Sequence, residues 1–432
     1  MGGPGATTMR LAARDRAHAA VDHIRVLGPF AGIGAADLAR ALRRLHAVEP
    51  TDPLVCRLSS GRRHWLPVAA DDGIADLLAE AVVAAGDSAT AAVITSYLLH
   101  HRLGDLPMLA VVGGGHVGLR ISHAFGDNRT LATVLPDLLN AAATGRCPLR
   151  RSAATTVRSP LITALRHQVL RDPGQFVAAL HRRRPPRTDP PADDPGRRWL
   201  PRPAYHSACS PGALPGLLAW RDAFAPGVRV TAMLAAATWT AFATAGLGPQ
   251  RPGYTTLVDL RRYLPPGVTV PGNFSWDHDL TPDDPTDPVS VHRALNAELA
   301  SGAPLLALAR HTARQALPDP GHPDEAGTRF AMIPTRPGVE LSFASTGHLD
   351  GYERLPSAGP HDEHCDISAP APLGPCGASV AFSQLHGTLQ VNVGFHASTF
   401  DRTVVAAAVD RLCADPTALL PGPPPSPDHY ST

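Results

Sequence analysis

Residues 107–139 read PMLAVVGGGHVGLRISHAFGDNRTLATVLPDLL and carry the pattern that decides the fold prediction. An apolar run, Met108–Val112, is followed by three glycines and then by His116–Ile121, in which apolar and polar residues alternate. This pattern predicts a strand, a glycine turn and a second strand. After a short loop, Arg129–Ala143 is helical in composition, and Pro136 should kink or break that helix.

The composition excludes several classes of protein. The chain has 432 residues, and all of its 39 Lys+Arg positions are arginine. Without lysine there can be no Schiff-base lysine and no Gly-rich phosphate loop with its lysine. The formal net charge of +1 argues against a nucleic-acid-binding protein, which is usually clearly basic. Hydrophobic residues make up 44% of the chain, which is enough for a large core.

Two proline-rich stretches divide the chain. Residues 182–197 combine arginines, prolines and aspartates without apolar periodicity, and we expect a linker there. Residues 421–432 read PGPPPSPDHYST and are expected to form a disordered tail. The division predicts an N-terminal lobe at residues 20–181 and a C-terminal lobe at residues 198–420. Both lobes mix helix and strand patterns, which predicts an α/β (α+β) fold.

The apolar periodicity of other segments predicts further helices and strands. Helices are expected at Ala35–His46, Gly73–Ala85, Val230–Gly246 and Thr399–Cys413, and strands at Tyr254–Asp259, at Val339–Ser345 and in a hairpin within Ala378–Phe395. Residues 230–250 form a long uncharged run of small and apolar residues, for which a membrane span is the alternative to the buried core helix that we expect. The first 25 residues contain no apolar signal segment, so we expect a cytoplasmic protein without a membrane span.

Three histidines precede an aspartate by four residues, in the pairs His18–Asp22, His101–Asp105 and His123–Asp127. Chance explains such spacings in a chain with 21 histidines, so the context of each pair must select among them. His101 lies in a loop before the predicted hairpin, whereas His123 lies at the end of its second strand and directly before a helix. From there an imidazole can project into a cleft, and a neutral imidazole can act as a general base.

The segment around His123 resembles the core of the CoA-dependent acyltransferase and condensation-domain superfamily, whose pattern is a hairpin, His-His-x-x-x-Asp-Gly and a helix. Its members include chloramphenicol acetyltransferase, HxxxD-type acyltransferases and peptide-synthetase condensation domains. A second stretch, VDLRRYLPP at residues 258–266 followed by Gly272-Asn273-Phe274, resembles the Val-Asp-x-Arg…Pro-Pro…Gly-Asn element of the superfamily. The chain departs from the first pattern at Ser122, which replaces the first His, and at Asn128, which replaces Gly.

The resemblance implies two chloramphenicol-acetyltransferase-like lobes, each a mixed sheet flanked by helices, with an active-site channel between them. It also implies an acyltransferase of natural-product metabolism that joins an acyl thioester to a hydroxyl or amine without an acyl-enzyme intermediate. The donor would be bound to CoA or to a carrier protein, as a substrate rather than a cofactor. We further expect a monomer that binds no nucleic acid. Two alternatives remain: condensation-like chemistry without transfer (cyclisation or epimerisation), and a non-catalytic module that recruits a carrier protein.

The resemblance also implies roles for single residues. His123 would be the general base, and the second catalytic-motif residue, Asp127, would form an ion pair with Arg261 across the lobe interface and so hold the His123 loop. A plain helix cap is the alternative role for Asp127. Substrate-binding positions are expected at Ser122, Gly126, Asn273, Trp276 and Ser345, with turn formation or core packing as the alternative for the last three. His361, His364 and Cys365 could suggest a metal site, but the sequence shows no second cluster that would complete it, so we expect no metal.

Overall fold

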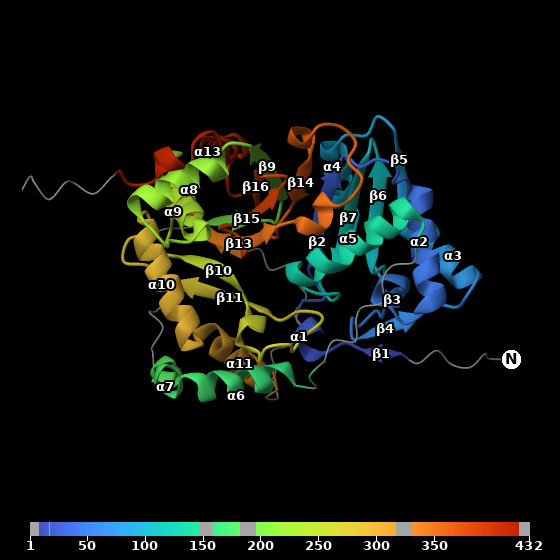
Figure 1. The fold of residues 1–432 in the computed structure, drawn as a ribbon, viewed down its shortest axis with the longest axis horizontal. Helices are drawn as coiled ribbons and strands as arrows, with labels where there is room; N and C mark the ends of the chain where they lie inside the picture. The colour runs from blue at the N-terminus through green and yellow to red at the C-terminus, as the bar shows by residue number, and fades with distance from the viewer. Residues whose placement is uncertain are drawn as a thin grey trace, which may run out of the picture.

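The computed structural model describes residues 8–16, 18–146, 157, 159–181, 196–316 and 331–422. These residues form two lobes that lie side by side, each built on its own sheet (Figure 1). The predicted linker at 182–197 and the predicted tail at 421–432 lie almost entirely outside the described residues.

The first lobe is built on a mixed sheet with the strand order β14-β2-β7-β6-β5. The strands are β2 (Asp22–Gly28), β5 (Val82–Gly86), β6 (Met108–Gly113), β7 (His116–Ser122) and β14 (Cys365–Ser368). The helices of this lobe are α2 (Ala35–Val48), α3 (Asp72–Ala81), α4 (Ala91–His100) and α5 (Asn128–Thr144). A small sheet of β1 (Met9–Arg10), β4 (His64–Pro67) and β3 (Cys56–Leu58) adjoins them.

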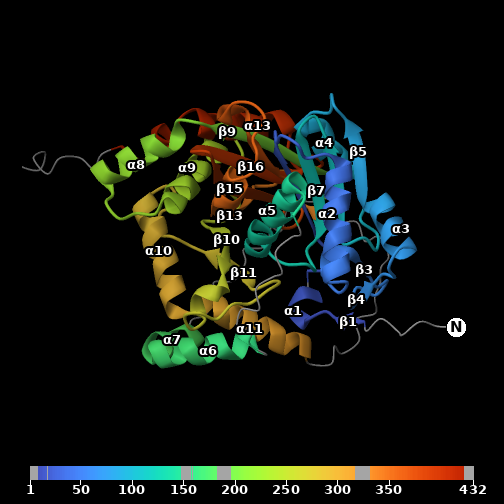
Figure 2. The same ribbon diagram turned by 45° about the vertical axis from the view of Figure 1, so that its right-hand side comes forward.

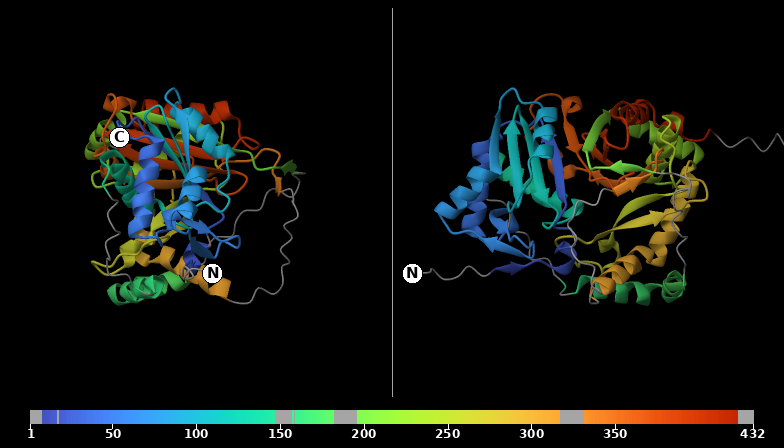
Figure 3. Two further views of the ribbon diagram at one scale, coloured as in Figure 1. Left: turned by 90° about the vertical axis from the view of Figure 1, so that its right-hand side faces the viewer. Right: turned by 180° about the vertical axis from the view of Figure 1, so that it is seen from behind.

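The second lobe is built on a mixed sheet with the order β11-β10-β13-β15-β16-β9, seen beside the first sheet in Figure 3. Its strands are β9 (Pro203–Ser210), β10 (Tyr254–Asp259), β11 (Ser275–Leu280), β13 (Glu340–His348), β15 (Gly377–Leu385) and β16 (Thr388–His396). Its helices are α8 (Ala213–Phe224), α9 (Val230–Thr244), α10 (Pro288–Ser301), α11 (Ala303–Ala316) and α13 (Arg402–Ala414), and β8 (Arg197–Trp199) pairs with β12 (Ala331–Ile333) at its side.

The α/β fold class is confirmed, and most predicted elements are present within a few residues of their expected bounds. The uncharged run at 230–250 forms the buried helix α9. Within the described ranges, no helix has the length and hydrophobicity needed to span a bilayer. The prediction of one helix over Gly73–Ala85 is wrong at its end. There α3 stops at Ala81, because Val82 and Val83 enter β5 and pair in parallel with β6, as β-branched residues favour.

Three segments pack in the other lobe from the one to which the predicted boundaries assign them. β14 follows the second lobe's β13 in sequence, yet it pairs antiparallel with β2 at the edge of the first-lobe sheet. Conversely, α6 (Pro160–Arg171) and α7 (Pro173–His181), which fall within residues 20–181, pack against α10 and α11 of the second lobe (Figure 2). Ala164 of α6 is fully buried in a small core that it shares with the 3-10 helix η2 (Leu260–Tyr263) of that lobe. The lobes are therefore tied together by exchanged secondary structure as well as by side-chain contacts.

Candidate active site

A cavity of about 350 Å³ lies between the lobes. Both lobes supply its walls, because β2 and the loop after β7 face β10, β11, β13 and β15 across it. Its apolar lining includes Leu131, Leu257, Phe343, Val380 and Phe382, and its polar lining includes His18, His23, His123, Asn128, Trp276 and Asp277. A cavity of this size, mostly apolar with a few convergent polar groups, is typical of a small-molecule site.

His123 is placed in the cavity wall by the end of β7. Its backbone N–H donates to the carbonyl of Val21 at 2.8 Å, which continues the pairing between β2 and β7 by one residue. The Nδ1 atom of the ring is buried and makes no hydrogen bond of ordinary geometry within the described residues. The residue itself lines the cavity, so its imidazole borders the open space.

Two other histidines stack on the ring of His123. The ring centroid of His23, on β2, lies 3.8 Å away, and that of His18 lies 4.7 Å away in a nearly parallel stack. His18 belongs to the first of the three His-x-x-x-Asp pairs, and nothing in the sequence pattern indicates that it lies beside the third. The cavity wall therefore contains three imidazoles in contact, rather than the single one expected.

Burial keeps these imidazoles neutral. Removal from water and, to a smaller extent, the neighbouring His18 together lower the pKa of His123 to about 4, although contacts with its own backbone and with Asn273 oppose the change. Burial also lowers the pKa of His18 and, more strongly, that of His23. At neutral pH the imidazole of His123 is consequently uncharged and able to accept a proton.

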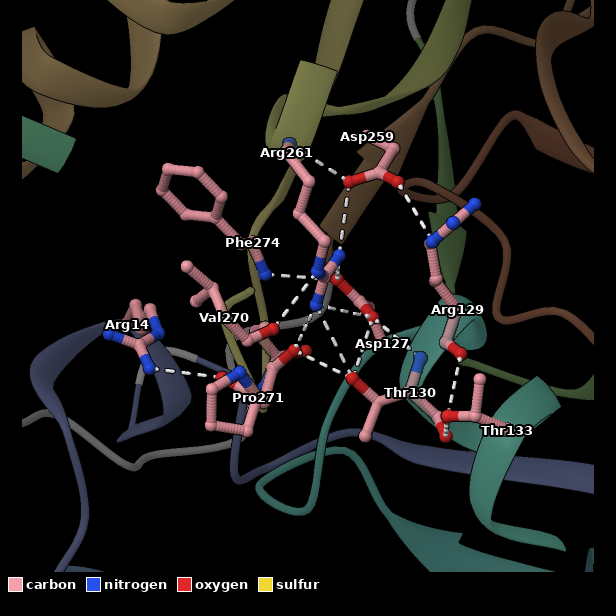
Figure 4. Close-up of polar contacts among 12 residues, drawn as sticks. Arg14, Asp127, Arg129, Thr130, Thr133, Asp259, Arg261, Val270, Pro271 and Phe274 are labelled. Carbon is pink, nitrogen blue, oxygen red and sulfur yellow. Dashed lines mark hydrogen bonds and ion pairs between the residues drawn. The ribbon is translucent and has the colours of Figure 1, made fainter. Parts of the chain in front are cut away.

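The loop after His123 is anchored to the second lobe by Asp127 (Figure 4). Arg261 donates from Nη1 to Asp127 Oδ2 at 2.8 Å and from Nη2 to Oδ1 at 3.2 Å, a two-point ion pair across the lobe interface. The same carboxylate accepts the backbone N–H of Phe274 at 2.9 Å and, as the N-cap of α5, that of Thr130 at 3.1 Å. Asp127 is 2% exposed; burial raises its pKa, but Arg261 and these N–H groups outweigh burial and hold the pKa below its usual value. Asp127 is thus both the ion-pair partner and the helix cap, which were weighed as alternatives.

Arg261 is itself held on several sides. Its guanidinium donates to Asp259 Oδ1 at 3.0 Å, to the Val270 carbonyl at 3.0 Å and to the Gly272 carbonyl at 2.7 Å. Gly272 has a φ of +79°, and a Cβ there would lie 2.8 Å from Asp15 Oδ1. A larger residue would therefore displace Asp15 or the Gly272 backbone, whose carbonyl accepts from Arg261.

Asn273 supports the loop from its other side. Its side-chain Nδ2 donates to the backbone carbonyl of His123 at 2.8 Å and to Asp15 Oδ1 at 2.9 Å, and its backbone N–H donates to the same Asp15 oxygen at 2.8 Å. Asp15, in α1 (Ala13–Arg16), is buried, and this raises its pKa despite the bonds from Asn273. A segment near the N-terminus therefore helps to position the catalytic-motif loop. The sequence held no recognisable signal for Asp15.

The five expected substrate-binding residues have different surroundings. Trp276 lines the cavity, whereas Ser345 is exposed and lies outside the cavity lining. Ser122 is buried and its hydroxyl accepts the N–H of Ala124, as part of the turn. Two more, Gly126 and Asn273, also lie outside the cavity lining and shape the loop: a Cβ on Gly126 would lie 2.7 Å from Thr130, and Asn273 makes the contacts above.

Besides His18 and His23, two polar residues line the cavity that the sequence does not predict as site residues. Asn128 replaces the turn glycine of the family pattern, but it is the first residue of α5 and lines the cavity, so no left-handed backbone is required of it. Asp277 lines the cavity with an exposed side chain, and the surrounding protein together with the nearby Asp279 raises its pKa to about 6. Within the described residues Asp277 has no ion-pair partner, whereas the lining residues Asp22 and Asp366 are paired with arginines at 2.8 and 2.6 Å. The alternation of β11 could have indicated that Trp276 and Asp277 face different ways, but not that both border a cavity.

No protein-family model matches this chain, and no curated protein sequence matches it either. Solved structures do match. The first condensation domain of the calcium-dependent antibiotic synthetase, in complex with a substrate analogue, has a TM-score of 0.58 and 15% identity, covering 99% of this chain and 100% of that one. Polyketide synthase associated protein 5 from Mycobacterium tuberculosis has a TM-score of 0.52 and 17% identity over 95% and 100%. The TRI3 trichothecene 15-O-acetyltransferase from Fusarium sporotrichioides has a TM-score of 0.57 and 11% identity over 94% and 95%.

These matches extend over nearly the whole of each chain, so the likeness concerns the complete two-lobed architecture. The chain has the fold shared by condensation domains and by this O-acetyltransferase, as the motifs around His123 and Arg261 predicted. At such identities the likeness defines the fold class, and the chemistry has to be argued from the cavity itself.

Proposed function

We propose that this protein is an acyltransferase of the condensation type, which joins an acyl thioester to a hydroxyl or an amine. The observation that carries the proposal is the position of His123. Its neutral imidazole faces a cavity enclosed by both lobes, on a loop whose aspartate is fixed by an arginine from the opposite lobe. A general base needs both an accessible lone pair and a fixed position.

In the proposed reaction, Nε2 of His123 takes the proton from the attacking hydroxyl or amine. The new C–O or C–N bond forms at the thioester carbonyl, and the C–S bond breaks as the tetrahedral intermediate collapses. The proton then passes from the imidazolium to the departing thiolate, so the histidine returns to its neutral form. No covalent acyl-enzyme is needed, because the acceptor attacks the thioester directly. Trp276, Asn128 and the apolar walls would contact the acyl or acceptor group.

The donor is proposed to be an acyl group on CoA or on a carrier protein, and the product a specialised metabolite. Similar structures support this class, since they include a condensation domain of an antibiotic synthetase and a polyketide synthase associated protein. Because the chain has no lysine, arginine would have to supply the permanently cationic contacts to the phosphates of either donor.

The test is a product screen with a matched pair of variants. Wild type is incubated with acyl-CoA and acyl-carrier donors against hydroxyl and amine acceptors, and products are identified by mass spectrometry. His123→Gln should lower product formation by about 10²–10⁴-fold, the usual contribution of a general base, and His101→Gln should leave it unchanged. Full turnover by His123→Gln would overturn the assignment of the base.

The same screen distinguishes acyl transfer from a second candidate function. Similar structures include an epimerisation domain and a cyclisation-docking bidomain, so condensation-like chemistry without transfer is also compatible with the fold. Epimerisation would give a product of unchanged mass and inverted configuration, and cyclisation a product lighter by one water. Acyl transfer is distinguished by a product that contains both donor and acceptor.

A further inference from the structure

A second group of histidines lies far from His123. It is formed where the crossover segment, residues 361–368 that lead into and include β14, meets the turn between β15 and β16. His361 belongs to η3 (His361–Glu363), His364 directly precedes β14, and His386 lies in the turn. In the first-lobe sheet, Asp22 pairs with Ser122 at the His123 end of β2, whereas Gly28 pairs with Cys365 at its other end. Six residues of extended strand separate these ends by about 20 Å. The group is therefore distinct from the candidate active site.

The three rings are close together. The centroids of His361 and His386 lie 4.1 Å apart in a nearly parallel stack, those of His364 and His386 lie 4.8 Å apart, and those of His361 and His364 lie 5.7 Å apart. Tetrahedral imidazole ligands of one Zn²⁺, with Zn–N distances of about 2.0–2.1 Å, have ring centroids about 5 Å apart. Two of the three separations already match this value within about 0.7 Å. The stacked pair would have to open by about 1 Å.

His364 supplies an independent sign that a ligand belongs here. It is 3% exposed, and its Nε2 atom is buried without a hydrogen-bond partner in the described part of the chain. A buried polar atom without a partner is costly and uncommon in folded proteins. The ring of His364 lies against those of His386 and His361, with the centroids 4.8 and 5.7 Å away in edge-on arrangements.

The backbone holds His386 in an unusual conformation. Its φ is +48° and that of Gly387 is +76°, as in the two-residue hairpin turns for which Asn-Gly is the preferred pair. A histidine at the first of these positions is less favourable than asparagine. Residues kept in such conformations are often kept for the position of their side chain.

A carboxylate lies beside the histidines. Glu353, on α12 (Asp350–Glu353), accepts the backbone N–H of His386 and contacts Nε2 of His348 at 2.8 Å. Imidazoles beside a carboxylate form an environment that suits a transition-metal cation.

We propose that His361, His364 and His386 bind a divalent transition-metal cation of the Zn²⁺ class. His361 is exposed and its ring makes no hydrogen bond to the described residues, so it can turn toward the cation. The bound cation would link the crossover segment to the β15–β16 turn and so fasten β14 in the first-lobe sheet. This inference does not depend on the proposed acyl transfer.

The experiment is a calorimetric titration of Zn²⁺ into the full chain after removal of metals with a chelator. We expect saturable binding of one ion and a rise in the thermal unfolding midpoint. His361→Ala and His386→Asn should each weaken binding at least tenfold, and asparagine keeps the left-handed turn intact. The double variant His100→Ala/His101→Ala, which removes two adjacent exposed histidines elsewhere, should bind as wild type does. Metal-free midpoints equal to that of wild type would show that the variants are folded.

A further variant tests a competing ligand set. His348, Asp350 and Glu353 have ligand atoms within 4.8 Å of one another, and they are the group in the described ranges whose present geometry could hold an ion. If His348→Ala abolishes binding while His361→Ala and His386→Asn do not change it, the ion sits on that exposed group and the proposal is wrong. Absence of saturable Zn²⁺ binding to wild type would also overturn it.

Discussion

Two His-x-x-x-Asp segments of the first lobe have the same spacing and opposite surroundings. His101 follows α4, where its Nδ1 contacts the Tyr97 carbonyl at 2.8 Å and its exposed ring stacks on that of Tyr97 at 3.7 Å. Asp105 points to solvent and pairs with Arg57 at 3.1 Å. All of these partners are local or on the surface, and neither residue lines the cavity.

The His123–Asp127 segment obtains its partners from the other lobe. Asp127 meets Arg261 and Phe274, and the carbonyl of His123 meets Asn273, all from one stretch of the second lobe. The comparison shows that the spacing itself has no chemical meaning. The His123–Asp127 pair differs because strand β7 ends at the lobe interface. There the charge of Asp127 is compensated by Arg261, and His123 borders a cavity.

The largest effect on stability is expected from Asp127→Ala. It removes the carboxylate that meets Arg261, caps α5 and accepts the Phe274 N–H, so the free energy of unfolding should fall by about 3–5 kcal/mol, as for other broken buried pairs. Urea midpoints of wild type and variant, followed by circular dichroism, measure the change. Asp127→Asn, which keeps the acceptor oxygen, should lose less. An unchanged midpoint for Asp127→Ala would show that the pair does not hold the lobes together.

The second-largest effect is expected from acidification, which should lower the stability of the fold through the buried imidazole of His123. The pKa of His123 is about 4 in the folded chain and about 6.5 when unfolded, so between these values the unfolded chain binds the extra proton. The free energy of unfolding is therefore highest above pH 6.5 and decreases as the pH falls toward 4, with His123 contributing up to about 3 kcal/mol. In urea titrations at pH 7.5, 6 and 5, His123→Gln should lose less stability on acidification than wild type. A loss as steep as that of wild type would contradict the low pKa.

A smaller effect is expected from the stacked imidazole of His18. Removing it by His18→Ala admits water to His123 and removes a neighbouring positive charge at low pH, so the pKa of His123 should rise by up to about one unit. Titration of the ring protons by NMR measures this directly. His100→Ala serves as the control and should leave the His123 titration unchanged. If the titration is also unaffected in His18→Ala, the depression comes entirely from the protein around the ring.

The smallest effect is expected from Asp105→Ala. The Asp105 side chain is 52% exposed, and Arg57 keeps Glu80 as a partner at 2.7 Å. Exposed ion pairs contribute about 0.2–1 kcal/mol, so the urea midpoint should move very little. A loss comparable with that of Asp127→Ala would remove the distinction between the two segments.

Local pattern was sufficient for the fold class and for most elements. The alternation in His116–Ile121 and the helical periodicity of Arg129–Ala143 correspond to β7 and α5, because each buries one face against its own lobe. The ion pair between Asp127 and Arg261 followed from the resemblance of two motifs and could not be obtained from spacing. His18, Asp15 and Asp277 were beyond reach, since their roles arise from contacts between segments that are distant in sequence. The same is true of His386, which completes the cluster begun by His361 and His364.

The crossover strand also bears on how the chain folds during synthesis. β2 is made before both of its neighbours and acquires β7 on one side about a hundred residues later, but its other edge stays open until residues 365–368 emerge from the ribosome. Until then the nascent first lobe exposes a row of unpaired backbone N–H and C=O groups along β2, the kind of edge at which chains aggregate. A fragment that ends at residue 181 would lack β14 and leave this edge open, so the first-lobe sheet is complete only when residues 365–368 are also present.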